Sequence, residues 1–294
     1  MDRGLWARLK RGLSKHLFGG RLFSEADHSV GAFDNTYEWK CSAFQYVYDH
    51  SPAGGYQAYL WGVVEGASLA KALGYSHVSV IEFGVAGGRG LLALEEISIH
   101  VEKMVGIRID VYGFDTGIGL PAPTDYRDVP YMWNEGFFPM DKGKLIPQLK
   151  RAQLKLGLIE NTIQDFIASE FAPVAFISFD FDLYIGTRQA LSLLEGDPNR
   201  VIPRISCYFD DIMGFGYNEF TGERLAINEF NTEHARRKVT LNHGLKWFVP
   251  WRNRDDRWVE MMYLAHIFDH PLYGAPARMK IPNILDISGN YRQT

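Results

Sequence analysis

The stretch that decides the fold is "VIEFGVAGGRGLLALEE", residues 80 to 96. It sets four glycines, Gly84, Gly87, Gly88 and Gly90, between a strand-like segment and a helix-like one. Glycines at such a turn let backbone N–H groups and a ligand approach each other without interference from a Cβ atom. The run therefore predicts a nucleotide-binding turn, although a tight turn without any ligand needs glycines as well.

Strand-like and helix-like segments alternate around this turn. Strands are predicted over residues 77 to 85, 107 to 115, 158 to 163, 174 to 182, 204 to 211, 239 to 249 and 257 to 268. Helices are predicted over residues 56 to 74, 88 to 103, 141 to 156, 165 to 171, 186 to 196 and 222 to 237. This order indicates a doubly wound α/β fold, in which a mostly parallel seven-stranded sheet has helices on both faces and an antiparallel hairpin at its C-terminal edge.

The loop signal "SPAGG" at residues 51 to 55 divides the chain. We expect residues 1 to 55 to form a helical N-terminal extension or lid, and residues 56 to 294 to form the main domain. The extension begins with leucines spaced four apart among basic residues, at Leu5, Leu9, Leu13 and Leu17. A short basic amphipathic helix of this kind docks on its own protein or a partner subunit more often than on an anionic membrane surface.

The composition excludes several classes of protein. A formal net charge of −4 gives no overall basic field, so nucleic acid is not an expected partner. The two cysteines, Cys41 and Cys207, match no zinc-ligand spacing and fit a reducing compartment. No apolar run has the length of a membrane span. We therefore expect a cytoplasmic protein, with homo-oligomerisation possible.

Two acidic residues sharpen the prediction of a ligand at the glycine turn. Glu82 stands at the end of the strand before the glycines, where a carboxylate can hold the ammonium group of an amino-acid-bearing ligand. Asp115 ends the next strand, where an acid accepts hydrogen bonds from ribose hydroxyls in nucleotide folds. Both features together fit S-adenosylmethionine. A salt bridge for Glu82 and a turn-forming role for Asp115 are the structural alternatives.

A second acidic cluster follows two later strands. Asp180 and Asp182 end one of them, and Asp210 and Asp211 end the next. The carboxyl ends of parallel strands share one edge of the sheet, so four carboxylates are expected beside the glycine turn. Mg²⁺ relieves such repulsion and activates a substrate hydroxyl, while a free carboxylate accepts the proton. Helix capping is the alternative for any single aspartate of the cluster.

With these motifs in view, the chain resembles the macrocin O-methyltransferases, metal-dependent class I enzymes with a Rossmann-like fold that methylate sugar hydroxyls. The resemblance spans about residues 80 to 230 and rests on "EFGVAGGRG", "GFDTGIGLP", "DFDLYIGTRQAL" and a "DD" pair followed by "GERLAINEF". It implies Mg²⁺ ligands at Asp180, Asp210 and Asp211, and a base at Asp180 with Asp182 as the second candidate. It also implies donor contacts in the two turns, at Glu82, Gly84, Val85, Ala86, Gly88, Asp115 and Thr116.

The predicted function is that of an S-adenosylmethionine-dependent, Mg²⁺-dependent O-methyltransferase acting on a hydroxyl of a sugar or other small molecule. The alternatives are an NAD(P)-dependent oxidoreductase and a non-catalytic S-adenosylmethionine-binding protein. The long loop of residues 116 to 140 is rich in aromatic residues, and Tyr126, Tyr131 and Trp133 are candidates to stack on the acceptor.

Overall fold

The computed structural model describes residues 30 to 214, 216 to 250, 253, 255 to 275, 284 to 285 and 291 to 292. The basic leucine-spaced segment at the start of the chain lies outside these described residues.

Seven strands form one sheet in the order β3-β2-β1-β4-β5-β7-β6. They are β1 (His77–Phe83), β2 (Arg108–Asp115), β3 (Gln153–Leu156), β4 (Val174–Phe179), β5 (Val201–Phe209), β6 (Arg237–Leu241) and β7 (Met262–Ile267). All neighbours are parallel except β7, which runs antiparallel to both β5 and β6. The predicted fold class is thus confirmed: a mostly parallel seven-stranded α/β sheet, with an antiparallel pair at its C-terminal edge.

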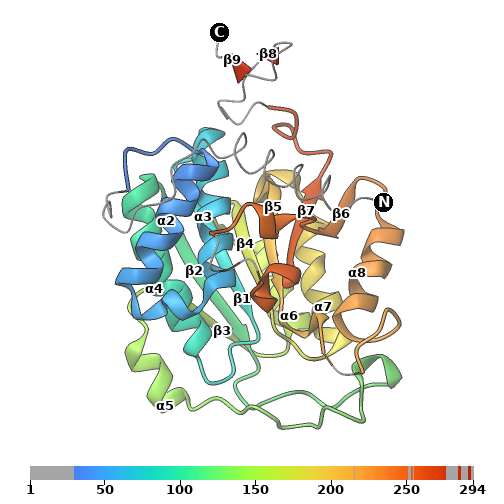
Figure 1. Ribbon diagram of the computed structural model, residues 1–294. Helices are drawn as coiled ribbons and strands as arrows, with labels where there is room; N and C mark the ends of the chain where they lie inside the picture. The colour runs from blue at the N-terminus through green and yellow to red at the C-terminus, as the bar shows by residue number, and fades with distance from the viewer. Residues whose placement is uncertain are drawn as a thin grey trace, which may run out of the picture.

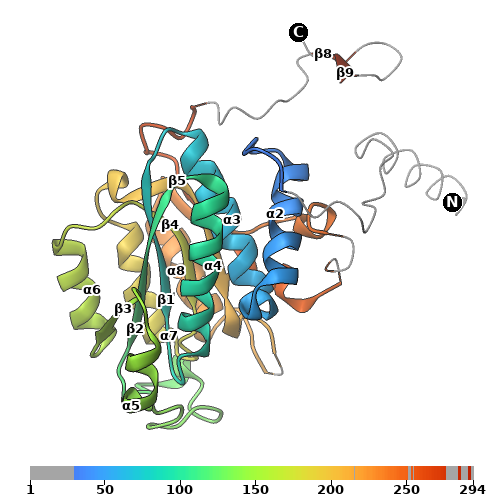
Figure 2. The same cartoon turned by 90° about the vertical axis from the view of Figure 1, so that its left-hand side faces the viewer.

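Helices cover both faces of this sheet (Figure 1). They are α2 (Tyr37–His50), α3 (Gln57–Ala72), α4 (Arg89–Val105), α5 (Lys142–Leu145), α6 (Ile159–Ala168), α7 (Tyr184–Ala190) and α8 (Gly222–Glu233). Figure 2 shows the sheet nearly edge-on, with α2, α3 and α4 on one side and α6 on the other. Because β1 lies between two helical layers, its Val80, Ile81 and Phe83 are all buried, on both faces of the strand.

The strand order places a topological switch point between β1 and β4. The chain runs from β1 to β2 on one side, and later returns to β4 on the other side of β1. In an open α/β sheet, the crevice outside the carboxyl ends of the strands at this point is where ligands bind. Both sequence motifs, the glycine turn after β1 and the acid pair after β4, therefore lie at the switch point.

The described part of the N-terminal extension packs against the core. Thr36 caps α2 by accepting a hydrogen bond on Oγ1 from the Trp39 N–H at 3.2 Å. Phe44 of α2 is fully buried, with its ring centroid 6.1 Å from that of Trp61 in α3. Residues 30 to 50 thus share the hydrophobic core of the main domain, and a separate extension up to residue 55 stays a prediction.

Two predicted elements between β2 and β4 are wrong. The helix expected over residues 141 to 156 is one short turn, α5, followed by a 3₁₀ turn at Ile146–Gln148 and then β3. Pro147 lacks the N–H that a continuing helix needs, and the buried carboxylate of Glu95 accepts N–H groups from Lys150 and Ala152, which fixes an extended chain.

The strand expected over residues 158 to 163 is the beginning of α6. Its buried side chains, Ile159, Ile163 and Phe166, recur at the spacing of one helical face. The expected helix over residues 165 to 171 is the second half of the same helix, which ends at Ala168.

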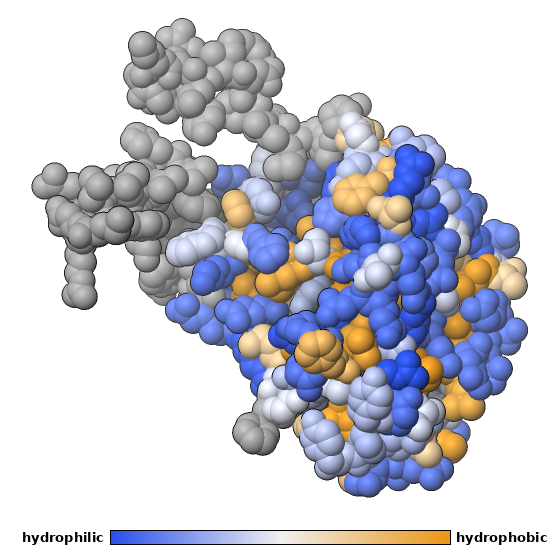
Figure 3. Space-filling model, turned by 90° about the vertical axis from the view of Figure 1, so that its right-hand side faces the viewer, coloured by the Kyte–Doolittle hydropathy of each residue, from blue (hydrophilic) through white to orange (hydrophobic). Residues whose placement is uncertain are grey.

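Among the described residues, no helix is long and apolar enough to cross a membrane. Figure 3 shows one face of the molecule, on which hydrophilic residues predominate and hydrophobic residues are interspersed. A short second sheet pairs β8 (Ile284–Leu285) with β9 (Tyr291–Arg292), which the sequence did not indicate.

Candidate functional site

A cavity of about 580 Å³ opens at the carboxyl-end edge of the sheet. Its walls come from the turns after β1, β2, β3, β4 and β5, from the beginning of α7 and from the loop of residues 116 to 140. The polar and charged residues of the lining are Asp115, Thr116, Thr124, Glu160, Asp180, Asp182, Gln189, Asp210 and Asp211. Both predicted halves of the site, the nucleotide turn and the acid cluster, thus face one space.

The glycine turn is pressed against the end of β4. Gly84 has a φ of +83°, and a Cβ atom there would lie 1.7 Å from the carbonyl oxygen of Asp180. No side chain fits such a contact with backbone, and the left-handed conformation itself favours glycine. The close approach brings the turn and the first acid of the cluster to the same wall of the cavity.

Glu82 lies behind this turn and is not part of the cavity lining. Its carboxylate is buried, and Oε1 accepts a hydrogen bond from the Tyr59 hydroxyl at 2.7 Å, while Oε2 has no partner among the described residues. Burial raises the pKa of Glu82 to about 8. A Cβ atom at Gly90 would lie 1.9 Å from Oε1, so the carboxylate occupies the space that this glycine leaves free.

Asp115 ties the turn after β1 to the turn after β2. Its Oδ2 accepts hydrogen bonds from the N–H groups of Val85 at 3.0 Å and Ala86 at 2.8 Å, and its Oδ1 accepts one from Gly117 at 2.6 Å. The carboxylate thus has the turn-forming role that was the structural alternative. A carboxylate offers about four acceptor positions, so one remains for a ligand hydroxyl.

The other residues predicted to contact the donor take different positions. Gly84, Ala86, Asp115 and Thr116 line the cavity, whereas Val85 and Gly88 do not. Gly88 caps α4, and a Cβ atom there would meet the side chain of Leu145. A role in donor binding stays a prediction for all of them.

All four aspartates of the second cluster line the cavity. Because β4 ends at Phe179, Asp180 and Asp182 both lie in the loop that follows, and their side chains need not diverge as in a strand. Asp182 has a φ of +61°, and its N–H donates to Oδ2 of Asp211 at 2.8 Å. This bond joins the loop after β4 to the turn after β5.

Burial and repulsion from neighbouring acids raise the pKa values of three of these aspartates, Asp180, Asp182 and Asp211. The pKa of Asp182 rises to about 8 and that of Asp211 to about 6, in both cases mainly through burial and then through neighbouring aspartates. The same two causes raise the pKa of Asp180 well above its ordinary range. A group of acids so placed favours either protons or a cation.

Three groups that sequence reasoning missed hold the cluster in place. Glu223, fully buried in the first turn of α8, accepts the Asp211 N–H on Oε2 at 3.0 Å. The Tyr217 hydroxyl donates to Oδ1 of Asp211 at 3.0 Å, and the Tyr208 hydroxyl donates to Oδ1 of Asp210 at 2.5 Å. Glu223 stood within a quoted motif, but an acid in the first turn of a helix is ordinary and gave no signal of its own.

A metal site is not preformed in the described part of the chain. No group of three or more histidine, cysteine, aspartate or glutamate side chains there is arranged to hold a metal ion. Both oxygens of Asp211 already accept hydrogen bonds. The donor set itself, carboxylate oxygens around a shared cavity, is the chemistry that Mg²⁺ prefers. Mg²⁺ binding at Asp180, Asp210 and Asp211 therefore stays a prediction.

The loop of residues 116 to 140 supplies an aromatic wall. Trp133 lines the cavity as predicted, together with Phe137 and Phe138, which the sequence analysis did not single out. Tyr126 and Tyr131 do not line it and are 70% and 69% exposed. Of the three aromatic residues proposed to stack on an acceptor, only Trp133 is in position to do so.

Comparison with known proteins gives matches to structures only. No family model and no curated protein matches this chain. Among the solved structures, the calicheamicin methyltransferase CalS11 matches at 19% identity and a TM-score of 0.44, covering 70% of this chain and 88% of its own.

Two further structures cover more of this chain at lower identity. An O-methyltransferase from Bacillus cereus in complex with SAH matches at 14% identity and a TM-score of 0.36, covering 90% of this chain and 99% of its own. The SAH-bound methyltransferase PaMTH1 from Podospora anserina matches at 13% identity and a TM-score of 0.38, covering 91% and 97%. Likeness at this level carries no information on the reaction, and the resemblance to macrocin O-methyltransferases stays a prediction.

Proposed function

We propose that this protein is an S-adenosylmethionine-dependent O-methyltransferase that acts on a hydroxyl of a sugar or other small molecule. The observation that carries the proposal is the single cavity that joins the glycine turn and Asp115 to the four aspartates after β4 and β5. A methyl donor at the first end and a hydroxyl at the second would meet within this cavity.

The donor end has unused capacity for both polar parts of S-adenosylmethionine. The free acceptor position of Asp115 suits a ribose hydroxyl, and Thr116 lies beside it in the cavity lining. The unpartnered Oε2 of Glu82 would suit the ammonium group of the methionine part, and because this oxygen is buried behind the turn, the turn would have to shift on donor binding to expose it. A positive charge at this oxygen would lower the raised pKa of Glu82 and ionise it, so donor binding would remove the cost of burying the acid.

The backbone of the turn completes the proposed donor site. We assign Gly84, Val85, Ala86 and Gly88 to it because Gly84 and Ala86 line the cavity and the other two fix the shape of the same turn.

At the other end of the cavity, Asp180, Asp210 and Asp211 are the proposed ligands of Mg²⁺. When bound, the ion would supply a positive charge that lowers the pKa of a substrate hydroxyl. Asp180 and Asp182 are the proposed proton acceptors. Burial and the neighbouring aspartates raise the pKa of Asp182 to about 8, so this carboxyl group is mostly protonated at neutral pH. A cation held among the aspartates would lower that pKa and leave the carboxylate able to accept a proton.

The acceptor is proposed to be small and to have both a hydroxyl group and an apolar or ring face. Trp133, Phe137 and Phe138 would pack against that face, while the aspartates would hold the hydroxyl.

Calorimetric titration with S-adenosylhomocysteine, with and without Mg²⁺, tests the proposal. Micromolar binding is expected, and the matched titration is NADPH, which the oxidoreductase alternative requires. Binding of NADPH, together with no binding of S-adenosylhomocysteine under either condition, would overturn the proposed function.

A further inference from the structure

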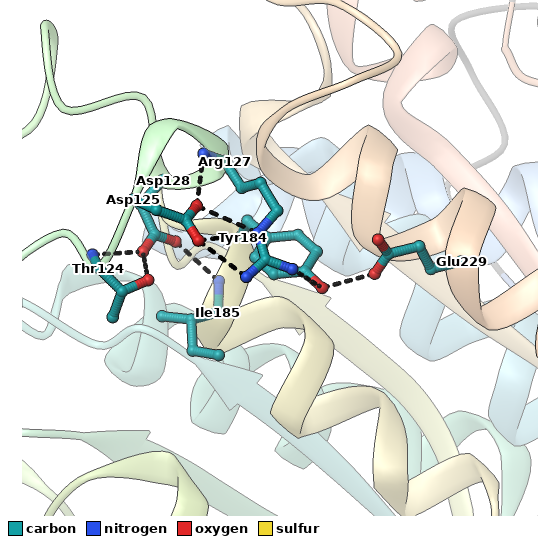
Figure 4. Close-up of polar contacts among 7 residues, drawn as sticks. All are labelled: Thr124, Asp125, Arg127, Asp128, Tyr184, Ile185 and Glu229. Atoms are coloured by element: carbon teal, nitrogen blue, oxygen red, sulfur yellow. Dashed lines mark hydrogen bonds and ion pairs between the residues drawn. The ribbon is translucent and has the colours of Figure 1, made fainter.

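One wall of the cavity is a loop that is fastened at several points. Backbone hydrogen bonds join the two sides of the loop, from the Leu120 N–H to the Phe137 carbonyl and from the Gly136 N–H to the Leu120 carbonyl, both at 2.8 Å. These bonds shape the loop but do not attach it to the rest of the molecule. Two attachments involve the residues shown in Figure 4, and a longer one runs from the Tyr131 hydroxyl to the Gly216 carbonyl at 3.5 Å.

Asp128 makes the first attachment. Its carboxylate is completely buried, and Oδ1 accepts the N–H of Ile185 in the first turn of α7 at 2.9 Å. Oδ2 accepts both the N–H of Thr124 at 2.8 Å and its hydroxyl at 2.6 Å. Thr124 and Ile185 both line the cavity, so Asp128 ties the loop wall to the α7 wall (Figure 4).

Tyr184 makes the second attachment. The guanidinium carbon of Arg127 lies 4.6 Å from the centroid of the Tyr184 ring, and an Arg127 N–H donates to the Tyr184 hydroxyl at 3.2 Å. The Tyr184 hydroxyl in turn donates to Glu229 of α8 at 2.5 Å (Figure 4). This chain of contacts joins the loop to α7 and α8.

The segment beyond these attachments is held between two strained residues. Val129 has a φ of +53° and Phe138 a φ of +61°, a conformation that is unfavourable for bulky and especially for β-branched side chains. Such strain persists only where the surrounding contacts determine the backbone. The aromatic segment of residues 130 to 137 lies between the two, and it includes Trp133 and Phe137 of the cavity wall.

We propose that Asp128 and Tyr184 are positioning residues that fasten the aromatic wall of the cavity to α7. Asp128 is the principal one, because its two oxygens hold both walls and no water reaches them, whereas the Arg127 contact is partly exposed. The proposal rests on the proposed function only where S-adenosylhomocysteine is used as a probe.

Asp128→Asn provides the sharpest test, because asparagine has the same shape and every partner of Asp128 is a donor. The amide NH₂ group must then face an N–H or hydroxyl donor, so at least one of the three bonds is lost. Hydrogen exchange should rise about tenfold or more in peptides spanning residues 119 to 140, as expected when a buried hydrogen bond is lost and its donor is left unpaired. The affinity for S-adenosylhomocysteine should fall several-fold.

Glu135→Gln is the matched control, since it removes one acid from an exposed position of the same loop and should change neither quantity. Tyr184→Phe should raise exchange around residues 125 to 128 while leaving the Ile185 amide protected. If Asp128→Asn does not fold, Thr124→Val, which removes one donor at constant shape, should still raise exchange in the loop.

The proposal would be overturned if the hydrogen-exchange rates of the loop peptides in Asp128→Asn and in Thr124→Val equalled those in Glu135→Gln. Hydrogen exchange needs no ligand, so failure of the proposed function, seen as no binding of S-adenosylhomocysteine by the unaltered protein, is a separate result.

Discussion

Gly84 and Asp180 are in direct backbone contact, since a Cβ atom on Gly84 would lie 1.7 Å from the Asp180 carbonyl oxygen. The two residues are almost a hundred positions apart in the chain, at the ends of the adjacent strands β1 and β4. One contact thus sets the distance between the proposed donor turn and the first acid of the cluster.

Gly84→Ala is expected to lower the free energy of unfolding by more than about 3 kcal/mol, because it adds both left-handed strain and a clash with backbone that cannot move aside. Gly87→Ala is the control within the same turn, since a Cβ there meets nothing within 4 Å. It should change stability by less than about 0.5 kcal/mol. Urea denaturation measures both, and equal midpoints for the two variants would contradict the contact.

Glu82→Gln is expected to stabilise the ligand-free protein at alkaline pH. The pKa of Glu82 is raised in the fold from 4.5 to about 8, so its contribution to stability is fully present below pH 4.5 and is lost as the pH rises to about 8. Glutamine cannot ionise and removes this loss. The gain should be on the order of 4 kcal/mol at pH 8 and should vanish near pH 4.5.

Thermal denaturation from pH 5 to pH 8.5 measures this difference. Glu135→Gln, at an exposed position, should follow the unaltered protein throughout. A constant difference between Glu82→Gln and the unaltered protein at every pH would show that ionisation of Glu82 is not its cause.

The same substitution should weaken the proposed donor binding. Glu82→Gln keeps an acceptor for the Tyr59 hydroxyl but offers no negative charge to an ammonium group. The affinity for S-adenosylhomocysteine should fall by about 10- to 100-fold, in line with the loss of a buried hydrogen bond between charged groups. An unchanged affinity in the more stable variant would remove Glu82 from the donor site.

The features that the sequence predicted correctly are those with local causes. Alternation of strands and helices, the glycine turn before α4 and the acids at the ends of β2, β4 and β5 are all visible in short windows of sequence. The failures need long-range information. The strand β3 depends on Glu95, more than fifty residues earlier, which accepts the N–H groups of Lys150 and Ala152.

The features of the candidate site also fall into those that short windows of sequence predict and those that depend on long-range contacts. Residue types and spacing indicated which acids gather, but not how they are held. The burial of Glu82 behind the turn follows from Tyr59 in α3, and the position of Asp211 follows from Glu223 in α8. The role of Asp128 depends on an amide of Ile185, 57 residues further along the chain. None of these pairings has a signal within a local window of the sequence.

The acid cluster gives the prediction that decides whether Mg²⁺ belongs to this site. In the absence of an ion, Asp210 is the neighbour that most raises the pKa of Asp180, so Asp210→Asn should relieve the repulsion between the two side chains. The melting temperature of the metal-free protein should then rise, by about 2 to 4 °C for each kcal/mol of repulsion removed. Millimolar Mg²⁺ should stabilise the unaltered protein and not this variant, because one proposed ligand is lost. Asp165→Asn, an exposed acid on α6, should retain the full response to Mg²⁺. Thermal denaturation with and without Mg²⁺ measures all three proteins, and an equal response in Asp210→Asn and the unaltered protein would place the ion elsewhere.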